Sequence, residues 1–198
     1  MSINFIYMKT IILCLALLAN IGNSGKTGRP PVKNASAVRT LKVDLSESVV
    51  DWHITKVTGK HDGALKVCAG QLSVRNHKLS GGMALLDMNS LAVTDLNQPD
   101  EGKLEANLKG SNFFDTRRFT TARFDITNVN YLPNDNAYVT IAGCLDLHGV
   151  SKSITFKAKI LKADDRGLMA KADLTVNRRD WNIATNNFKQ RFCHPKIK

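Results

Sequence analysis

The sequence has few of the residue patterns on which common catalytic and metal-binding sites depend. Among its 198 residues there are only 4 cysteines and 5 histidines. It contains no Cys-x-x-Cys pair and no histidine cluster that would hold a structural zinc ion, and no Gly-x-Ser-x-Gly elbow that would mark a hydrolase nucleophile. No apolar run approaches the roughly 20 residues of a membrane-spanning helix. We therefore expect no catalytic residues, no metal site and no transmembrane helix.

Acidic residues are scarce relative to basic ones. The 28 lysines and arginines outnumber the 17 aspartates and glutamates, which gives a formal net charge of +11, so a charged partner is expected to be anionic. The basic residues form no dense run and do not alternate with aromatic residues, so we expect no nucleic acid as a partner. The hydrophobic content of 43% is too high for a disordered chain, and the length fits one domain with an additional segment.

The first residues of the chain have the pattern of a secretory signal. Lys9 precedes an apolar run over residues 11–19, and small and polar residues follow as far as Gly25. A run of this length is typical of a signal peptide and is too short to cross a membrane unaided. We expect residues 1–24 to be a signal peptide that is removed on export.

Residues 25–38 have the composition of a flexible linker, and residues 39–198 are expected to form the domain. Loss of the signal peptide removes Lys9, Cys14 and no acidic residue, which lowers the net charge from +11 to +10. The cysteines that remain allow at most one disulfide within the chain. They are Cys68, Cys144 and Cys193.

Most of the domain alternates between apolar and polar residues with the period of two that is typical of half-buried strands. In residues 168–177 every even position is apolar, and most odd positions are polar. Similar runs predict eight or nine strands, at residues 40–45, 49–57, 64–75, 79–88, 104–108, 123–127, 139–147, 155–160 and 168–177. Gly70 is expected to mark a bulge or bend. A short helical turn is expected near residues 111–118, with Ser111 as its cap.

Strands that are apolar on one face, with few helical patterns between them, predict an all-β barrel or sandwich. The interior of a closed eight-stranded barrel is either filled with side chains or holds one small apolar ligand. The expected inward positions mix large residues, such as Phe124 and Phe156, with small ones, such as Gly143 and Ala158. Small inward residues leave volume for a ligand, but loops and the opposing wall can also fill it. The sequence pattern leaves both possibilities open.

Several separated motifs follow one another in a defined order between residue 41 and about residue 184. They are Trp52, Lys-Val-Thr-Gly-Lys-His-Asp-Gly at 56–63, Gly-Gln-Leu at 70–72, Leu-Ser-Gly-Gly at 79–82, Leu-Asp-Met-Asn-Ser-Leu at 86–91, Leu-Lys-Gly-Ser-Asn-Phe-Phe-Asp at 108–115, Phe-Thr-Thr-Ala-Arg-Phe at 119–124, Gly-Cys-Leu-Asp-Leu-His-Gly-Val-Ser-Lys at 143–152 and Asn-Arg-Arg-Asp-Trp-Asn-Ile at 177–183. Together they resemble the YceI-like family of lipocalin-like, polyisoprenoid-binding bacterial proteins. The resemblance implies an extended eight-stranded antiparallel β-barrel with an elongated apolar cavity. It also implies a periplasmic location, with secretion as the alternative, and neither catalytic residues nor a cofactor.

The ligand that the resemblance implies is an isoprenoid quinone or another long-chain lipid, bound for transport or storage. The apolar residues expected to line the cavity are Trp52, Leu85, Leu104, Leu108, Phe113, Phe114, Phe124, Ile126, Ile141, Leu145, Leu147, Phe156, Ile160, Leu174 and Trp181. The polar residues expected at its rim are Lys60, His61, His148 and Lys152. Transient contact with a membrane surface is a further expectation for such a carrier.

Two features depart from the family pattern. Only residues 184–198 follow the last motif, and they contain no run with a period of two, so the closing strand is expected to be short or missing. An open edge of this kind would favour a homodimer. In addition, Cys68 and Cys144 are both expected on the outer face, where a disulfide between them would need adjacent strands.

Two other functions remain possible on the sequence alone. The positive charge could serve a surface module that binds anionic partners, in which case affinity would fall steeply with added salt. Alternatively, the barrel could be an enzyme that acts on a lipid-linked substrate, with His61 or His148 as the base.

Overall fold

The computed structural model describes residues 6–14, 37–56 and 59–183, most of which lie in strands. The strands are β1 (Ile6–Cys14), β2 (Arg39–Lys42), β3 (Asp44–Lys56), β4 (Gly59–Arg75), β5 (Lys78–Val93), β6 (Thr121–Leu132), β7 (Asp135–Leu147), β8 (Val150–Ala163) and β9 (Leu168–Val176). The helical elements are α1 (Asp100–Lys109) and the short 3-10 helix η1 (Arg178–Trp181).

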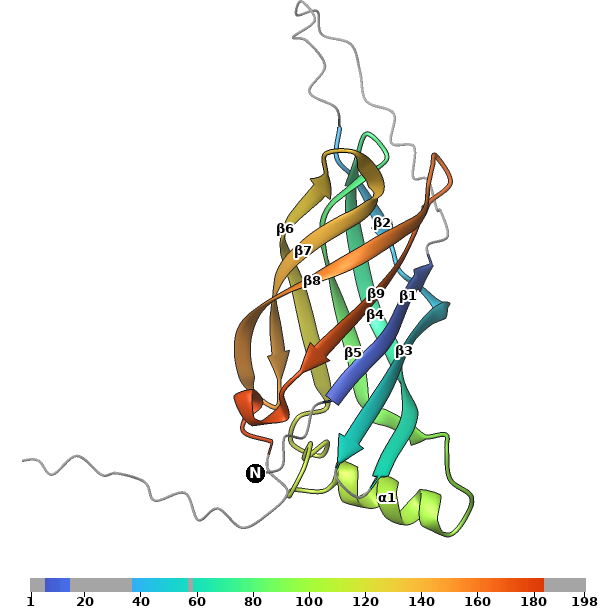
Figure 1. Ribbon diagram of the computed structural model, residues 1–198, viewed down its shortest axis with the longest axis vertical. Coiled ribbons are helices and arrows are strands. Elements are labelled where there is room, and N and C mark those ends of the chain that lie inside the picture. Colours follow the sequence, from blue (N-terminus) through green and yellow to red (C-terminus); the bar gives the residue numbers. More distant parts are fainter. Residues whose placement is uncertain (1–5, 15–36, 57–58, 184–198) are drawn as a thin grey trace, which may run out of the picture.

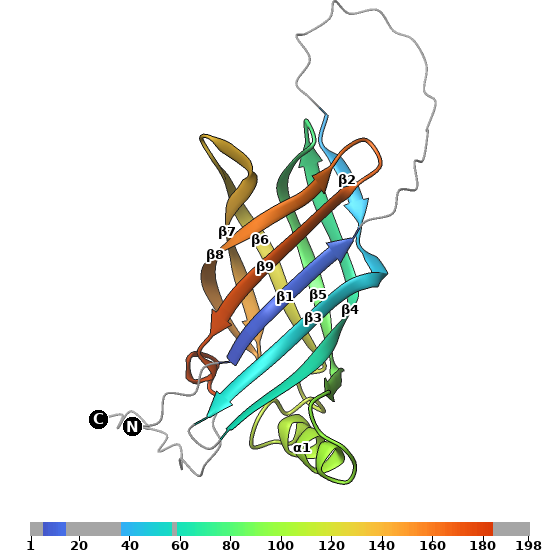
Figure 2. The ribbon, with the colours of Figure 1, turned by 45° about the vertical axis from the view of Figure 1, so that its right-hand side comes forward.

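The strands form one antiparallel sheet that closes into a barrel (Figure 1, Figure 2). Their order is β2–β4–β3–β1–β9–β8–β7–β6–β5, and β5 pairs in turn with β4. Both β2 and β3 pair with β4, so they act as one strand with a bend at Val43, whose N–H donates to the carbonyl of Gly70 at 3.0 Å. The wall therefore has eight strands, and the predicted all-β, eight-stranded antiparallel barrel is confirmed. Gly70 lies at the bend, beside a register shift between Val67 and Ala69.

One strand of the wall comes from the expected signal peptide. Residues Ile6–Cys14 form β1, which pairs with β3 on one side and with β9 on the other. The other residues of the expected signal peptide, 1–5 and 15–24, lie outside the described residues, as does most of the expected linker. Removal of residues 1–24 remains a prediction, and it would take away the strand that lies between β3 and β9.

The chain between β5 and β6 differs from the sequence prediction. The prediction of a strand at residues 104–108 is wrong, because these residues belong to α1. Leu104 and Leu108 are separated by about one helical turn as well as by two strand repeats, so their spacing fits both structures. Two acidic residues in the first turn and a lysine in the last turn favour the helix through its dipole.

The end of the barrel next to α1 and η1, called the helix end from here on, is closed by aromatic residues. Residues 111–118 form consecutive turns close to the expected position, and Phe113 and Phe114 point inward with 6% and 7% of their surfaces exposed. The indole Nε1 of Trp181 donates to the carbonyl of Leu145 at 3.2 Å. These contacts hold η1 across the mouth of the barrel.

A buried arginine strengthens the same closure. The guanidinium of Arg178 donates from Nη1 to the carbonyl of Ile183 at 2.9 Å and lies over the ring of Phe113, 5.7 Å from its centroid. Burial lowers the pKa of this guanidinium from its ordinary value, because the charged form loses solvation. The pKa of an arginine is high enough that the side chain remains charged at neutral pH.

The opposite end, called the hairpin end, carries the turns after β4, β6 and β8, and it is closed by aliphatic side chains. Those that are almost fully buried there are Leu41, Val74, Leu79, Val139 and Leu168. Both ends of the barrel are thus capped by buried apolar residues. Among the described residues, no helix has the length and apolar character needed to cross a membrane.

The placement of β1 predicts a specific cross-link in the uncleaved chain. Thr10 on β1 and Asp51 on β3 are register partners, and directly opposed residues of antiparallel strands are close enough for a disulfide. The double variant Thr10→Cys/Asp51→Cys should therefore form this disulfide on mild oxidation, as shown by peptide mass mapping. Each single variant serves as a control. A folded double variant that leaves both thiols free would contradict the position of β1.

Candidate functional site

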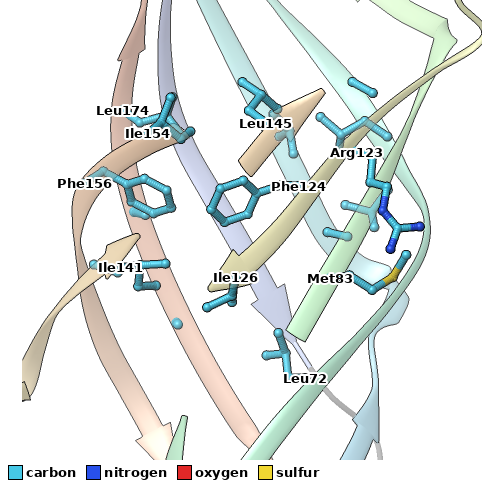
Figure 3. Close-up of a pocket in the computed structure, with 18 of the residues that line it drawn as sticks. Leu72, Met83, Arg123, Phe124, Ile126, Ile141, Leu145, Ile154, Phe156 and Leu174 are labelled. Carbon is cyan, nitrogen blue, oxygen red and sulfur yellow. The ribbon is translucent and has the colours of Figure 1, made fainter. Parts of the chain in front are cut away.

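The barrel contains an apolar cavity of about 100 Å³ at mid-height (Figure 3). Among the described residues its lining exposes apolar surface only, because the two charged residues that reach it, Arg123 and Lys171, contribute no polar atom. Its lining side chains come from strands all around the barrel. Each strand contributes every second residue, because successive side chains point to opposite faces of the sheet. The lining residues include Leu72, Leu86, Phe124, Ile126, Ile141, Leu145, Ile154, Phe156, Ala170 and Leu174. Such a space favours an apolar chain.

A second apolar cavity, of about 40 Å³, lies nearer the helix end. It is lined by Trp52 and Phe114 among others, and it shares Leu86, Ala122 and Leu145 with the larger cavity. These three side chains therefore form the partition between the two spaces.

The orientation of Phe124 depends on a glycine in the neighbouring strand. A Cβ atom at Gly143 would overlap the ring of Phe124, so a side chain at this position would push the ring away from β7. The ring also lies next to Phe156, with centroids 5.5 Å apart. Gly143 thus lets one large aromatic residue lie along the wall and leaves the middle of the barrel empty.

Nine of the residues predicted from the sequence line one of the two cavities. They are Trp52, Phe114, Phe124, Ile126, Ile141, Leu145, Leu147, Phe156 and Leu174. The period of two in the strands was sufficient to identify most of them, because inward and outward positions alternate regularly there.

The other six predicted lining residues lie elsewhere. Leu104 and Leu108 are on α1, and Phe113 and Trp181 belong to the closure of the helix end. Leu85 is a register partner of Arg123, and both residues line a groove on the outside of the barrel. The next residue of β5, Leu86, points inward instead. The sixth, Ile160, packs partly buried against the core without reaching either cavity. In β5 both Leu85 and Leu86 are apolar, so the alternation alone did not identify the inward one.

The four predicted rim residues all lie toward the helix end. His148 occupies the turn between β7 and β8, where its Nδ1 is 3.2 Å from the carbonyl oxygen of Trp181 and its ring packs on Phe119. His61 Nδ1 is 3.1 Å from a carboxylate oxygen of Asp95. Lys60 is exposed at the start of β4.

Lys152, the fourth, is exposed near the start of β8. It is a register partner of Leu145, a cavity residue. Since directly opposed residues point to the same face of a sheet, this lysine occupies an inward position of β8.

Charged and titratable groups near the cavities are engaged with one another. The guanidinium of Arg123 donates to both carboxylate oxygens of Asp125, at 2.6 and 2.7 Å, on the outside of the wall. This pairing holds the pKa of the Asp125 carboxyl below its ordinary value. His53 and Asp62 form a close pair between register partners of β3 and β4, a contact that the sequence reasoning missed. Among the described residues, no cluster of three His, Cys, Asp or Glu could hold a metal ion.

The structure separates the two cysteines expected on the outer face. Cys68 lies on β4 and Cys144 on β7, and both are free thiols. Strands β5 and β6 lie between them in the wall, so the two residues do not meet the requirement of adjacent strands. Cys193 lies outside the described residues.

Comparison with known proteins identifies a family for this architecture. The family model of the YceI-like domain matches residues 41–197. Among solved structures, BcnA of Burkholderia cenocepacia is similar with a TM-score of 0.51 and 16% identity, over 67% of this chain and 98% of that one. A YceI protein of Campylobacter jejuni has a TM-score of 0.47 and 16% identity, over 85% of this chain and 82% of the other. None of the curated proteins compared with the chain matches it.

The contact between Gly143 and Phe124 predicts a change that fills the cavity. Gly143→Ala should force the Phe124 ring inward, and the added Cβ would also lie 2.5 Å from the backbone carbonyl oxygen of Asp125 on β6. The variant should therefore take up less of an apolar probe such as farnesol and be destabilised by about 1–3 kcal/mol through overpacking. Gly81→Ala is the matched control, because the nearest atom to a Cβ there is 3.9 Å away. Calorimetric titration with farnesol and thermal unfolding measure both effects. Equal farnesol affinity for the two variants would contradict this role of Gly143.

Proposed function

This chain belongs to the YceI-like family, and we propose that it binds a long-chain isoprenoid or a similar amphiphilic lipid in its barrel, for transport or storage and without catalysing a reaction. The observation that carries the proposal is the cavity wall, which exposes only apolar surface. Burial of an apolar chain in such a space is favourable by roughly 25 cal/mol per Å² of surface removed from water. No polar contact inside the barrel is needed.

The size of the cavities sets a condition on this proposal. Spaces of about 100 and 40 Å³ are comparable with a cavity that holds a single aromatic ring, so a long chain must displace side chains as it enters. Displacement of the side chains in the shared partition of Leu86, Ala122 and Leu145 would lengthen the apolar space most, because it would connect the two cavities. A ligand of about 40 heavy atoms that contributes about 0.3 kcal/mol per atom reaches roughly −12 kcal/mol. That gain exceeds the cost of a few rotamer changes.

A binding role also fits the polar residues of the site. The two histidines considered as bases, His61 and His148, contact Asp95 and a backbone carbonyl at the helix end. Neither lines the two cavities, where an apolar chain would lie. The signal-like sequence of residues 1–24 supports a periplasmic protein, which would meet lipids at the surface of a membrane.

The ligand can be identified by native mass spectrometry of the protein purified from cells, followed by solvent extraction. We expect one isoprenoid or other long-chain amphiphile per chain, because displacement of the shared partition would join the two cavities into one column of apolar space. Binding of added isoprenoid quinone should change little with salt, since the contacts are apolar. An unliganded mass with no uptake of added quinone, together with salt-sensitive binding to anionic vesicles, would instead support a basic surface module.

A further inference from the structure

The wall of the barrel is incompletely paired between β8 and β9. Their register partners run from Ala158 with Ala172 to Ala163 with Leu168. The lower part of β8, residues 150–157, has no register partner in β9, and residues 173–176 of β9 have none in β8. Figure 1 shows the lower half of β8 curving away from β9. This unpaired stretch is called the seam.

The seam lies directly beside the larger cavity. Ile154 and Phe156 on β8 and Leu174 on β9 line the cavity, and all three are only partly buried (Figure 3). By contrast, the residues that close the two ends of the barrel are almost fully buried, as Trp181 at 3% and Leu168 at 2% exposed show. Cavity residues away from the seam, such as Phe124 and Ile126, are partly buried too, so the break in strand pairing is what distinguishes this part of the wall.

Other unpaired stretches of the wall are bridged by side chains. Where the upper parts of β5 and β6 separate, the phenol oxygen of Tyr131 accepts a hydrogen bond from the N–H of Leu79 at 2.6 Å. Lys78 spans the same gap to Asn136 at 2.9 Å. Near the hairpin end, Arg39 of β2 donates to the carbonyl of Asp165, in the turn after β8, at 2.8 Å.

The seam also carries a charged residue at an inward position. Along β8 the inward positions at the seam are those of Val150, Lys152, Ile154 and Phe156, as their register partners on β7 show. Lys152 alone among these four is charged, and it is exposed. An ammonium group at this position lies where the head of an amphiphile would remain once its tail is inside.

We propose that the seam between β8 and β9 is the entrance through which the apolar tail reaches the cavity, and that Lys152 contacts an anionic head group, a phosphate or a carboxylate. This inference rests on the proposed function and specifies the ligand further. Below the seam, contacts of Trp181 with His148 and Leu145 hold η1 against β7. Above it, the paired part of β8 and β9 limits the opening.

A cross-link across the seam tests the entrance. If the pairing of β8 with β9 continued in the same register beyond Ala158 and Ala172, Lys157 would lie opposite Asp173. Both residues are exposed on the outer face. In the full chain with its native cysteines changed to serine, Lys157→Cys/Asp173→Cys is closed by oxidation, or by a short bis-maleimide if the thiols do not oxidise. Farnesol uptake, followed by stopped-flow tryptophan fluorescence, should slow by about tenfold or more, as expected for a gated step.

The control cross-link lies in the paired part of the same two strands. Lys159 and Lys171 are register partners, so oxidised Lys159→Cys/Lys171→Cys should leave the uptake rate unchanged. Reduction of the disulfide in Lys157→Cys/Asp173→Cys should restore the original rate. Unchanged uptake with the seam verifiably closed would overturn the entrance. No farnesol binding by any form, including the native chain, would instead overturn the proposed function.

A charge substitution tests the role of Lys152. Lys152→Met should weaken the binding of farnesyl phosphate by about fivefold, the upper range for an exposed charge pair, and leave farnesol affinity unchanged. Lys157→Met removes the same charge from an outward position of β8 and should affect neither ligand. A parallel measurement with hexadecanoate and hexadecanol distinguishes a phosphate from a carboxylate head. Equal losses for Lys152→Met and Lys157→Met with both anionic ligands would overturn the specific contact.

Discussion

The interior of this barrel depends on aromatic rings that lie over glycines in neighbouring parts of the chain. Trp52 on β3 is the register partner of Gly63 on β4, where a Cβ atom would overlap the indole. A Cβ atom at Gly143 on β7 would likewise overlap the ring of Phe124 on β6, although the two residues are not register partners. Because large side chains lie along the wall in this way, a barrel of eight strands retains empty apolar space that its side chains would otherwise fill.

The period of two in the strands predicted an all-β barrel or sandwich and much of the lining, and the family resemblance predicted the eight-stranded barrel. The sequence did not predict α1, since two leucines four residues apart fit a helix and a strand equally well. Leu85 was assigned to the wrong face because its neighbour Leu86 is also apolar. The seam has no counterpart in the residue pattern: Ile154, Phe156 and Leu174 alternate as regularly as residues in the paired part of the same strands. How far two strands pair depends on the curvature of the whole sheet.

Part of the site was visible in the sequence only after the register was known. Lys152 is a charged residue at a position of β8 where the alternation calls for an apolar one. From the sequence alone, this lysine could equally mark the point where the strand begins. The role of β1 is a further case, because its residues, Ile6–Cys14, overlap the apolar run at 11–19 that predicted a signal peptide. In the uncleaved chain β9 pairs with β1 along one edge, and the seam lies along its other edge. The lower half of β9 therefore has a partner strand on one side only.

The proposed binding requires that the barrel take up an apolar chain longer than its present cavities, which it can do by moving Leu86 and Leu145 apart. The most direct test is the affinity of the protein for geraniol, farnesol and geranylgeraniol, which differ only in the number of isoprene units. The account predicts that affinity rises with each added unit, because every unit buries further apolar surface once the partition has moved. Affinity that is highest for geraniol and falls for the longer alcohols would show that the partition is fixed and would contradict the claim.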